Sequence, residues 1–164
     1  MRTKSAFDEL KNLHLKASVN KNPNIPTFAR CTPAYSDKTA NGLTKCIIDF
    51  INLSEGQAER INNTGRQIDN RQTVEDYLGF KRTIGSVEWI KGTGTDGTAD
   101  VSATINGRSV KIEIKIGRDI QSEKQKQYQN KIELAGGIYY IAKDFESFYY
   151  WYKLKFNSNA NCAN

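Results

Sequence analysis

Asn106-Gly107 is the feature of this sequence that most constrains its fold. An Asn-Gly pair between two β-rich segments is the strongest short-range signal for a β-hairpin, because a type I′ turn needs positive φ at both central residues. The arms of the predicted hairpin are residues 100–105 and 108–116. With a two-residue turn Ile105 pairs with Arg108, and the register of every other pair follows.

This register places two acidic residues opposite each other. In an antiparallel hairpin the residue numbers of every pair have the same sum. The pair Ile105 and Arg108 sets this sum at 213, so Asp100 lies directly across from Glu113. Side chains alternate along a strand, so these two residues share the polar face with Lys115. The other face is apolar and carries Val101, Ala103, Ile105, Val110, Ile112, Ile114 and Ile116. Opposed carboxylates destabilise a sheet, so the pattern predicts a compensating divalent cation with Lys115 beside it.

The rest of the chain predicts a mixed α/β fold, with a mixed sheet flanked by helices. We expect a helix and a Pro/Asn-rich connector or arm over residues 1–36, one domain over 37–155 and a disordered tail over 156–164. The expected elements of the domain are a helix from Asp37 through Ile61 with a possible interruption at 54–56, a short helix over Thr73–Leu78, a strand over Ile84–Ile90, the hairpin, a helix from Ser122, a strand over Ile138–Ala142 and a helix from Phe145 to about Leu154. The order is helix, three strands, helix, strand, helix.

The composition is that of a soluble globular protein. The chain has 164 residues, a net charge of +6 and a mean hydropathy of −0.65. No apolar segment approaches membrane-span length and the first residues do not resemble a signal peptide, so we expect an intracellular, cytoplasmic protein with no membrane partner. A single histidine excludes His-rich metal sites and disfavours a Ser-His-Asp triad. The positive charge fits a polyanionic partner.

The loop from Gly92 to Gly97 has the spacing G-x-G-x-x-G. In a dinucleotide-binding fingerprint a helix follows, so that the pyrophosphate sits on its N-terminus. Here a strand follows, so we reject the cofactor interpretation. The glycines instead allow the backbone to turn tightly into the hairpin, or to approach a phosphate closely.

Asp100, Glu113 and Lys115 form the strongest candidate site. Each carboxylate offers an oxygen ligand to Mg²⁺, which prefers hard oxygens and keeps several waters. A metal at this point would polarise a phosphate oxygen and acidify a bound water, while Lys115 positions that water or stabilises developing charge. The alternative is a solvated strand face, since Glu-x-Lys alone is common; the acidic residue across the turn favours a site.

Several of these residues together resemble the motif of the PD-(D/E)xK nuclease superfamily. They are Thr98-Ala99-Asp100, then Glu113-Ile114-Lys115, Gln125 on the next helix, and the strand after Gly136-Gly137. The similarity is greatest to the VRR-NUC and Holliday-junction-resolvase-like branches, often found in phage and bacterial genomes. It covers about residues 84–152, and the preceding long helix loosely.

The resemblance implies a restriction-endonuclease-like αβββαβ core in a bacterial or phage-encoded protein. It implies that Asp100, Glu113 and the Ile114 carbonyl hold Mg²⁺, which Mn²⁺ can replace, and that Lys115 is the catalytic lysine. Ala99 stands where the motif has proline. That position is not a ligand, so the departure affects recognition of the motif more than activity.

Members of the superfamily often add an acidic residue from the helix before the sheet. Glu59 is our first choice, because it lies in the densest polar patch of the predicted helix beside Arg60, and Glu55 is the second. An exposed helical Glu paired with a neighbour explains Glu59 equally well. Glu88 and Asp96 are weaker alternatives.

Gln125 has two interpretations that the sequence does not separate. The resemblance implies a glutamine that orients the lysine or contacts the phosphate. Gln125 is also the last member of the capping box Ser122-Glu123-Lys124-Gln125, so helix capping alone explains it. Basic residues around the site would bind phosphates without reading sequence, although each is also explained as a solvated charge. They are Arg60, Lys111, Arg118, Lys124 and Lys126.

These observations predict a small Mg²⁺-dependent endonuclease that hydrolyses DNA. The alternative is a nucleic-acid-binding or assembly protein that keeps the nuclease fold without cutting. The charge suits both, and only the intact Asp, Glu and Lys set favours the enzyme. A homodimer would suit an enzyme that cuts two strands. The structure of the substrate and its sequence specificity stay open.

Overall fold

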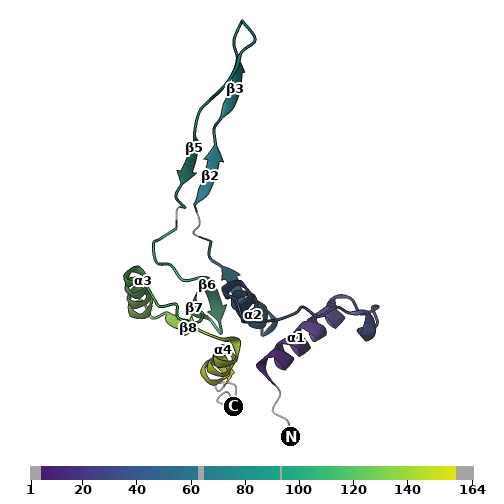
Figure 1. Ribbon diagram of the computed structural model, residues 1–164. Helices are drawn as coiled ribbons and strands as arrows, with labels where there is room; N and C mark the ends of the chain where they lie inside the picture. Colours follow the sequence, from purple (N-terminus) through teal and green to yellow (C-terminus); the bar gives the residue numbers. More distant parts are fainter. Residues whose placement is uncertain (1–4, 63–64, 93, 158–164) are drawn as a thin grey trace. The chain divides into compact units, whose positions relative to one another are not determined.

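The computed structural model describes residues 5–62, 65–92 and 94–157 of the chain (Figure 1). The chain divides into two compact units: Asn62–Asp96 forms one, and the remainder forms the other. Residues 62–96 of the smaller unit lie inside the predicted single domain over 37–155, and residues 1–36 are grouped with the larger unit.

The larger unit is a mixed α/β structure with a mixed sheet flanked by helices, as predicted. Its four strands lie in the order β1-β6-β7-β8; β7 and β8 are parallel, and the other neighbours are antiparallel. Helices α2 and α3 lie on either side of this sheet (Figure 1). The elements are α1 (Ala6–Lys21), the 3₁₀-helix η1 (Thr27–Ala29), α2 (Ala40–Leu53), β1 (Gln57–Arg60), β6 (Val101–Ile105), β7 (Arg108–Ile114), α3 (Glu123–Leu134), β8 (Ile138–Ala142), α4 (Phe145–Tyr152) and the π-helix η2 (Lys153–Asn157).

The β6-β7 hairpin has the predicted turn and register. Asn106 and Gly107 both have positive φ, 49° and 74°, as a type I′ turn requires. The observed pairs run from Ile105 with Arg108 to Val101 with Ile112. The apolar face predicted for these strands is the buried one, so the pattern of alternation assigns the two faces correctly.

The core lies between the apolar face of the sheet and the helices on that side. Phe50 of α2 is fully buried and makes edge contacts with Phe145 and Phe148 of α4 at ring-centroid distances of 5.8 and 6.3 Å. Full burial of a side chain of this size contributes about 1.5–3 kcal/mol. Helix α1 packs on α2 and α4 through Ala6 and Leu10, so it belongs to the same unit.

The predicted continuation of the long helix through Gln57–Ile61 is wrong. Helix α2 ends at Leu53, and Glu55 adopts a left-handed conformation with φ 64° that turns the chain back. Gln57–Arg60 is strand β1, antiparallel to β6. Asn52 holds this strand, since its amide side chain bonds both the N–H and the carbonyl of Ala58 at 2.7 and 3.1 Å.

The smaller unit is a β-hairpin made of two consecutive two-stranded segments. The inner pair is β2 (Arg66–Asp69) with β5 (Val87–Ile90), and the outer pair is β3 (Gln72–Glu75) with β4 (Lys81–Ile84). We refer to Asn62–Asp96 as the hairpin unit. In the described part of the chain, each of these strands pairs with only one other.

Two predictions for this segment are wrong. The expected helix over Thr73–Leu78 is instead β3 and a turn, in which the Asp76 carboxylate accepts the N–H groups of Leu78 and Phe80 at 2.9 and 3.0 Å. The expected strand over Ile84–Ile90 is broken at Gly85, which has φ 98°. Its second half pairs with β2 and not with the hairpin of the larger unit, where β1 supplies the remaining strand.

The C-terminal elements largely follow the prediction. Ser122 and Asp144 cap α3 and α4 as expected. The π-helix η2 extends to Asn157 and buries Phe156, so described structure reaches into the expected tail over residues 156–164. Residues 158–164 lie outside the described residues. Among the helices that are described, none has the length and apolar character needed to cross a bilayer.

Candidate active site

An open pocket of about 240 Å³ lies where β1, β6 and β7 meet the first turn of α2. It brings together residues that are far apart in the sequence. Its lining consists of Ala40, Thr44, Arg60, Asp100, Glu113, Ile114, Lys115, Asp119 and Gln125. The pocket thus collects the three residues of the predicted Asp, Glu and Lys set, which lie on one side of the hairpin as the register requires.

Asp100 immediately precedes β6 and is tied to the neighbouring strands. Its Oδ2 accepts the backbone N–H of Ile114 at 2.9 Å, and its carbonyl accepts the N–H of Ile61 at 2.8 Å. Asp100 and Glu113 are the next residues along the two strands after the pair Val101 and Ile112. The carboxylate is therefore fixed beside the Glu113-Ile114 peptide.

Glu113 is buried, with 1% of its surface exposed, and it has three polar partners. Its Oε1 accepts a short hydrogen bond from Gln125 Nε2 and pairs with Lys115 Nζ at 3.2 Å, and Tyr139 donates to Oε2 at 3.3 Å. Burial, and after it the Asp100 carboxylate, raise the pKa of Glu113 against the opposing effects of Lys115 and Tyr139. A further positive charge at this point would stabilise the ionised carboxylate.

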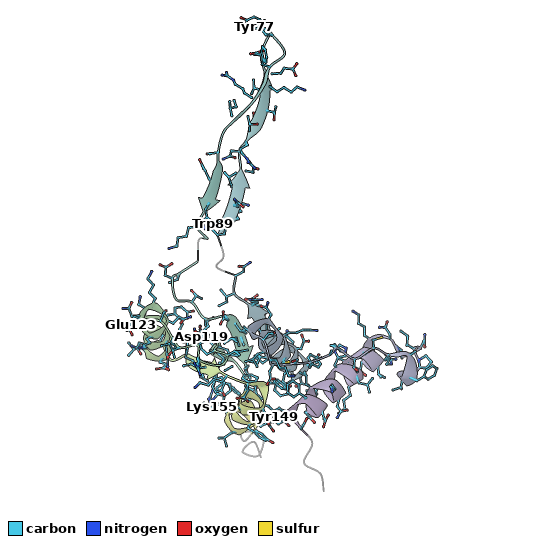
Figure 2. All side chains as sticks on the ribbon, in the orientation of Figure 1. Tyr77, Trp89, Asp119, Glu123, Tyr149 and Lys155 are labelled. Carbon is cyan, nitrogen blue, oxygen red and sulfur yellow. The ribbon has the colours of Figure 1, made fainter. Side chains whose placement is uncertain are left out.

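Lys115 follows β7, and its ammonium group lies between two carboxylates. Glu113 Oε1 is 3.2 Å from Nζ and Asp119 Oδ2, in the segment that leads to α3, is 3.3 Å from it; Figure 2 labels Asp119. Burial alone would lower the pKa of Lys115, but Glu113 and Asp119 outweigh it, so its pKa lies above the usual value. Lys115 is therefore a protonated donor held inside the pocket.

Gln125 caps α3, which is one of the two interpretations that the sequence left open, and its other contact is with Glu113 and not with Lys115. Its Oε1 accepts the Ser122 N–H at 2.9 Å and its backbone N–H donates to Ser122 Oγ, which completes the capping box. Its Nε2 donates to Glu113. Gly97 allows this approach, because a Cβ there would lie 2.5 Å from the Lys124 backbone. The start of α3 is thereby held against the segment that carries Asp100.

Glu59 does not lie where the sequence placed it. It is exposed on strand β1, opposite Ser102, and is not part of the pocket lining. The prediction depended on a helix that ends before this residue. Glu55 lies in the turn after α2, and Glu88 and Asp96 belong to the hairpin unit. The lining residues from α2 are Ala40 and Thr44, neither of which is acidic.

Of the predicted phosphate-binding residues, only Arg60 lines the pocket. Lys111 is half-buried and donates to Ser102 Oγ at 2.5 Å, and Lys126 pairs with Glu123 at 2.7 Å. Arg118 and Lys124 are exposed outside the lining. Of these five basic residues, Arg60 is therefore the one whose side chain is at the pocket.

The pocket lining offers carboxylate oxygens from Asp100, Glu113 and Asp119. Among the described residues, no group of three or more His, Cys, Asp and Glu side chains is placed to hold a metal. Asp119 pairs with Lys115, which leaves Asp100 and Glu113 as the set of two carboxylates beside the backbone of Ile114. Mg²⁺ is usually held by one or two carboxylates, with waters and phosphate oxygens in the other positions. The set is too small for an all-protein cage of the kind that Ca²⁺ prefers.

Three residues of the site were missed by sequence reasoning. Tyr139 has a usable signal, because side-chain alternation places it on the Glu113 face once β8 is known to be parallel to β7. Asp119 follows Lys115 by four residues, a spacing that outside a helix carries no information. Thr44 enters the lining only through the packing of α2.

The sequence matches no protein-family model and no curated protein.

Proposed function

We propose that the chain is a Mg²⁺-dependent endonuclease that hydrolyses DNA phosphodiester bonds. The observation that carries the proposal is the convergence of Asp100, Glu113 and Lys115 in one open pocket, with Glu113 buried and held by neighbouring side chains. A buried carboxylate beside a second carboxylate and a protonated lysine is a costly arrangement, which is typical of a functional site.

The arrangement of the elements supports the same proposal. The larger unit runs α2, β1, β6, β7, α3, β8, which is the αβββαβ order of the PD-(D/E)xK nuclease core that the sequence motif resembles. Asp100 lies at the start of β6 and Glu113 near the end of β7, so the motif residues meet at one edge of the sheet. The topology and the motif are independent observations that agree.

Asp100, Glu113 and the Ile114 carbonyl would hold the ion. When bound, Mg²⁺ supplies charge neutralisation at the phosphate and acidifies bound water. Lys115 donates hydrogen bonds, so its ammonium group can orient an attacking water and stabilise charge that develops on the phosphate. Arg60 can pair with a phosphate oxygen at the mouth of the pocket. Gln125 keeps the Glu113 carboxylate in place.

The test is cleavage of supercoiled plasmid and of a four-way DNA junction, with Mg²⁺, with Mn²⁺ and with EDTA. We expect metal-dependent cutting by the native chain and its loss in Glu113→Gln and in Lys115→Ala, by a factor of about 100 or more. The matched controls are Glu133→Gln and Lys155→Ala, which make the same chemical changes outside the pocket. These two variants should cut DNA as fast as the native chain.

A different result would favour a protein that binds nucleic acid without cutting it. If the native chain cuts neither DNA with either metal but retards both on a gel, the endonuclease proposal fails and the binding function replaces it. Comparison of the plasmid with the junction also measures whether cutting depends on DNA structure.

A further inference from the structure

The hairpin unit exposes an unusual amount of apolar surface. In the described part of the chain, eight of the fifteen exposed large apolar side chains belong to this unit, although it is much the smaller of the two. They are Val74, Tyr77, Leu78, Phe80, Ile84, Val87, Trp89 and Ile90. Tyr77 lies at the tip of the hairpin (Figure 2). Monomeric proteins rarely leave such a group of side chains in water.

Both faces of the inner pair carry exposed apolar side chains, whereas in the outer pair Val74 and Ile84 share one face and the other face is polar, with Thr73, Glu75, Lys81 and Thr83. Within the pair β2-β5, alternation places Val87 and Trp89 on one face and Ile90 on the other, and all three are exposed. An antiparallel sheet usually has one covered face, and an isolated two-stranded hairpin is at best marginally stable in water. The ribbon therefore needs a partner surface to become a stable element.

The charge of the hairpin unit argues against nucleic acid as that partner. The unit has five basic and five acidic residues, so its net charge is zero, and the whole excess of +6 lies in the rest of the chain. Three of its five basic side chains are paired within the unit: Arg71 with Asp69, Lys81 with Glu75 and Lys91 with Asp96. Surfaces that bind nucleic acid are strongly basic. A neutral, apolar ribbon suits a protein partner.

We propose that the hairpin unit is the surface through which two copies of this chain associate. Two copies carry +6 each outside the unit and repel there, whereas the neutral ribbons can approach without repulsion. The area is sufficient: at exposed fractions of 94%, 69% and 66%, Tyr77, Phe80 and Trp89 leave on the order of 450 Å² open to water. A stable interface needs about 800 Å² per partner, and the five aliphatic side chains add to the aromatic area.

Light scattering on the full chain after size exclusion tests the proposal. We expect a mass of twice 18.5 kDa for the native chain, and the monomer mass for the triple variant Tyr77→Ser, Phe80→Ser, Trp89→Ser. The matched control places three serines at exposed apolar positions outside the unit, Phe28, Leu134 and Leu154, and should remain a dimer. A monomeric native chain, or a triple variant that remains dimeric, would overturn the proposal.

A second measurement on the native side chains removes the dependence on folding of the triple variant. Trp89 and Trp151 are the two tryptophans of the chain, so Trp151→Phe leaves Trp89 as the fluorophore. Acrylamide should quench Trp89 weakly at high protein concentration and several-fold more strongly on dilution, as the interface opens. Quenching that does not change with concentration contradicts association through this unit. Neither measurement depends on DNA cleavage, so the proposed nuclease activity and the dimer can fail separately.

Discussion

Glu113 is a buried carboxylate that three neighbouring side chains hold in place. Lys115 supplies a charge, Gln125 an amide hydrogen bond and Tyr139 a hydroxyl hydrogen bond, each from a different part of the chain. Burial, followed by the Glu113 carboxylate, raises the pKa of Tyr139, so the phenol remains a neutral donor at neutral pH. The side chain of Glu113 therefore has little freedom to rotate away from Asp100.

Tyr139→Phe removes the hydroxyl hydrogen bond and keeps the ring. Because residues that orient a metal-binding carboxylate typically contribute 10–100-fold, we expect DNA cleavage to fall by about 10-fold. The rate of plasmid nicking at saturating Mg²⁺ measures this directly. Tyr139 is a positioning residue, so a higher Mg²⁺ concentration should be needed for half-maximal activity.

Tyr140→Phe is the matched control for this prediction. Tyr140 is the next residue on β8 and stacks on Trp151 at 4.1 Å, on the side of the sheet away from Glu113. Its substitution should leave both the rate and the Mg²⁺ dependence unchanged. Equal effects of the two substitutions would show that the hydroxyl of Tyr139 has no specific role.

The residues of the candidate site differ in whether the neighbouring sequence is enough to predict their position. Asp100, Glu113 and Lys115 could be predicted because one turn fixes their register. Gln125 was identified from its motif, but its contact with Glu113 depends on how α3 approaches the sheet. Glu59 was misplaced because it lies beyond the end of the helix to which it was assigned.

At the scale of elements, the β6-β7 hairpin depends on the two residues of its turn. Asn106 and Gly107 hold left-handed backbone conformations that other residues adopt only at a cost. No atom lies within 4 Å of a Cβ placed at Gly107. A substitution there therefore tests backbone conformation alone, without a packing contribution.

Gly107→Val should lower the free energy of unfolding by about 1–2 kcal/mol, the cost of a left-handed non-glycine residue. Urea denaturation followed by circular dichroism measures the change. Ser109→Val places the same side chain at an exposed strand position two residues on, where a β-branched residue is favourable, and should not destabilise the chain. If Gly107→Val lowered the free energy of unfolding by less than about 0.5 kcal/mol, the result would contradict the strain expected for this turn.

The elements that sequence patterns did not predict are those stabilised by distant contacts. Gln57–Arg60 consists largely of good helix formers, and it is a strand because Ala58 enters the core and Asn52 binds its backbone. The hairpin unit was missed because its strands are exposed on both faces and lack the alternation that marks a half-buried strand. The β6-β7 hairpin and helices α3 and α4 were predictable because their turn and capping residues act locally.

At the scale of the whole molecule, charge and apolar surface are divided between the two units. The larger unit carries the candidate active site and the whole net charge of +6, as a partner of DNA would. The hairpin unit is neutral and exposes large apolar side chains. This division matches the two proposals, with DNA cleavage assigned to one unit and association of copies to the other.

The central claim is that Asp100 and Glu113 act together as a divalent-cation site. Titration of the protein with Mn²⁺, followed by electron paramagnetic resonance, measures this directly. We predict that the native chain binds Mn²⁺, that Asp100→Asn and Glu113→Gln each abolish this binding, and that Glu59→Gln, outside the pocket, does not change it. The absence of Mn²⁺ binding by the native chain, or binding that survives both pocket substitutions, would contradict the account.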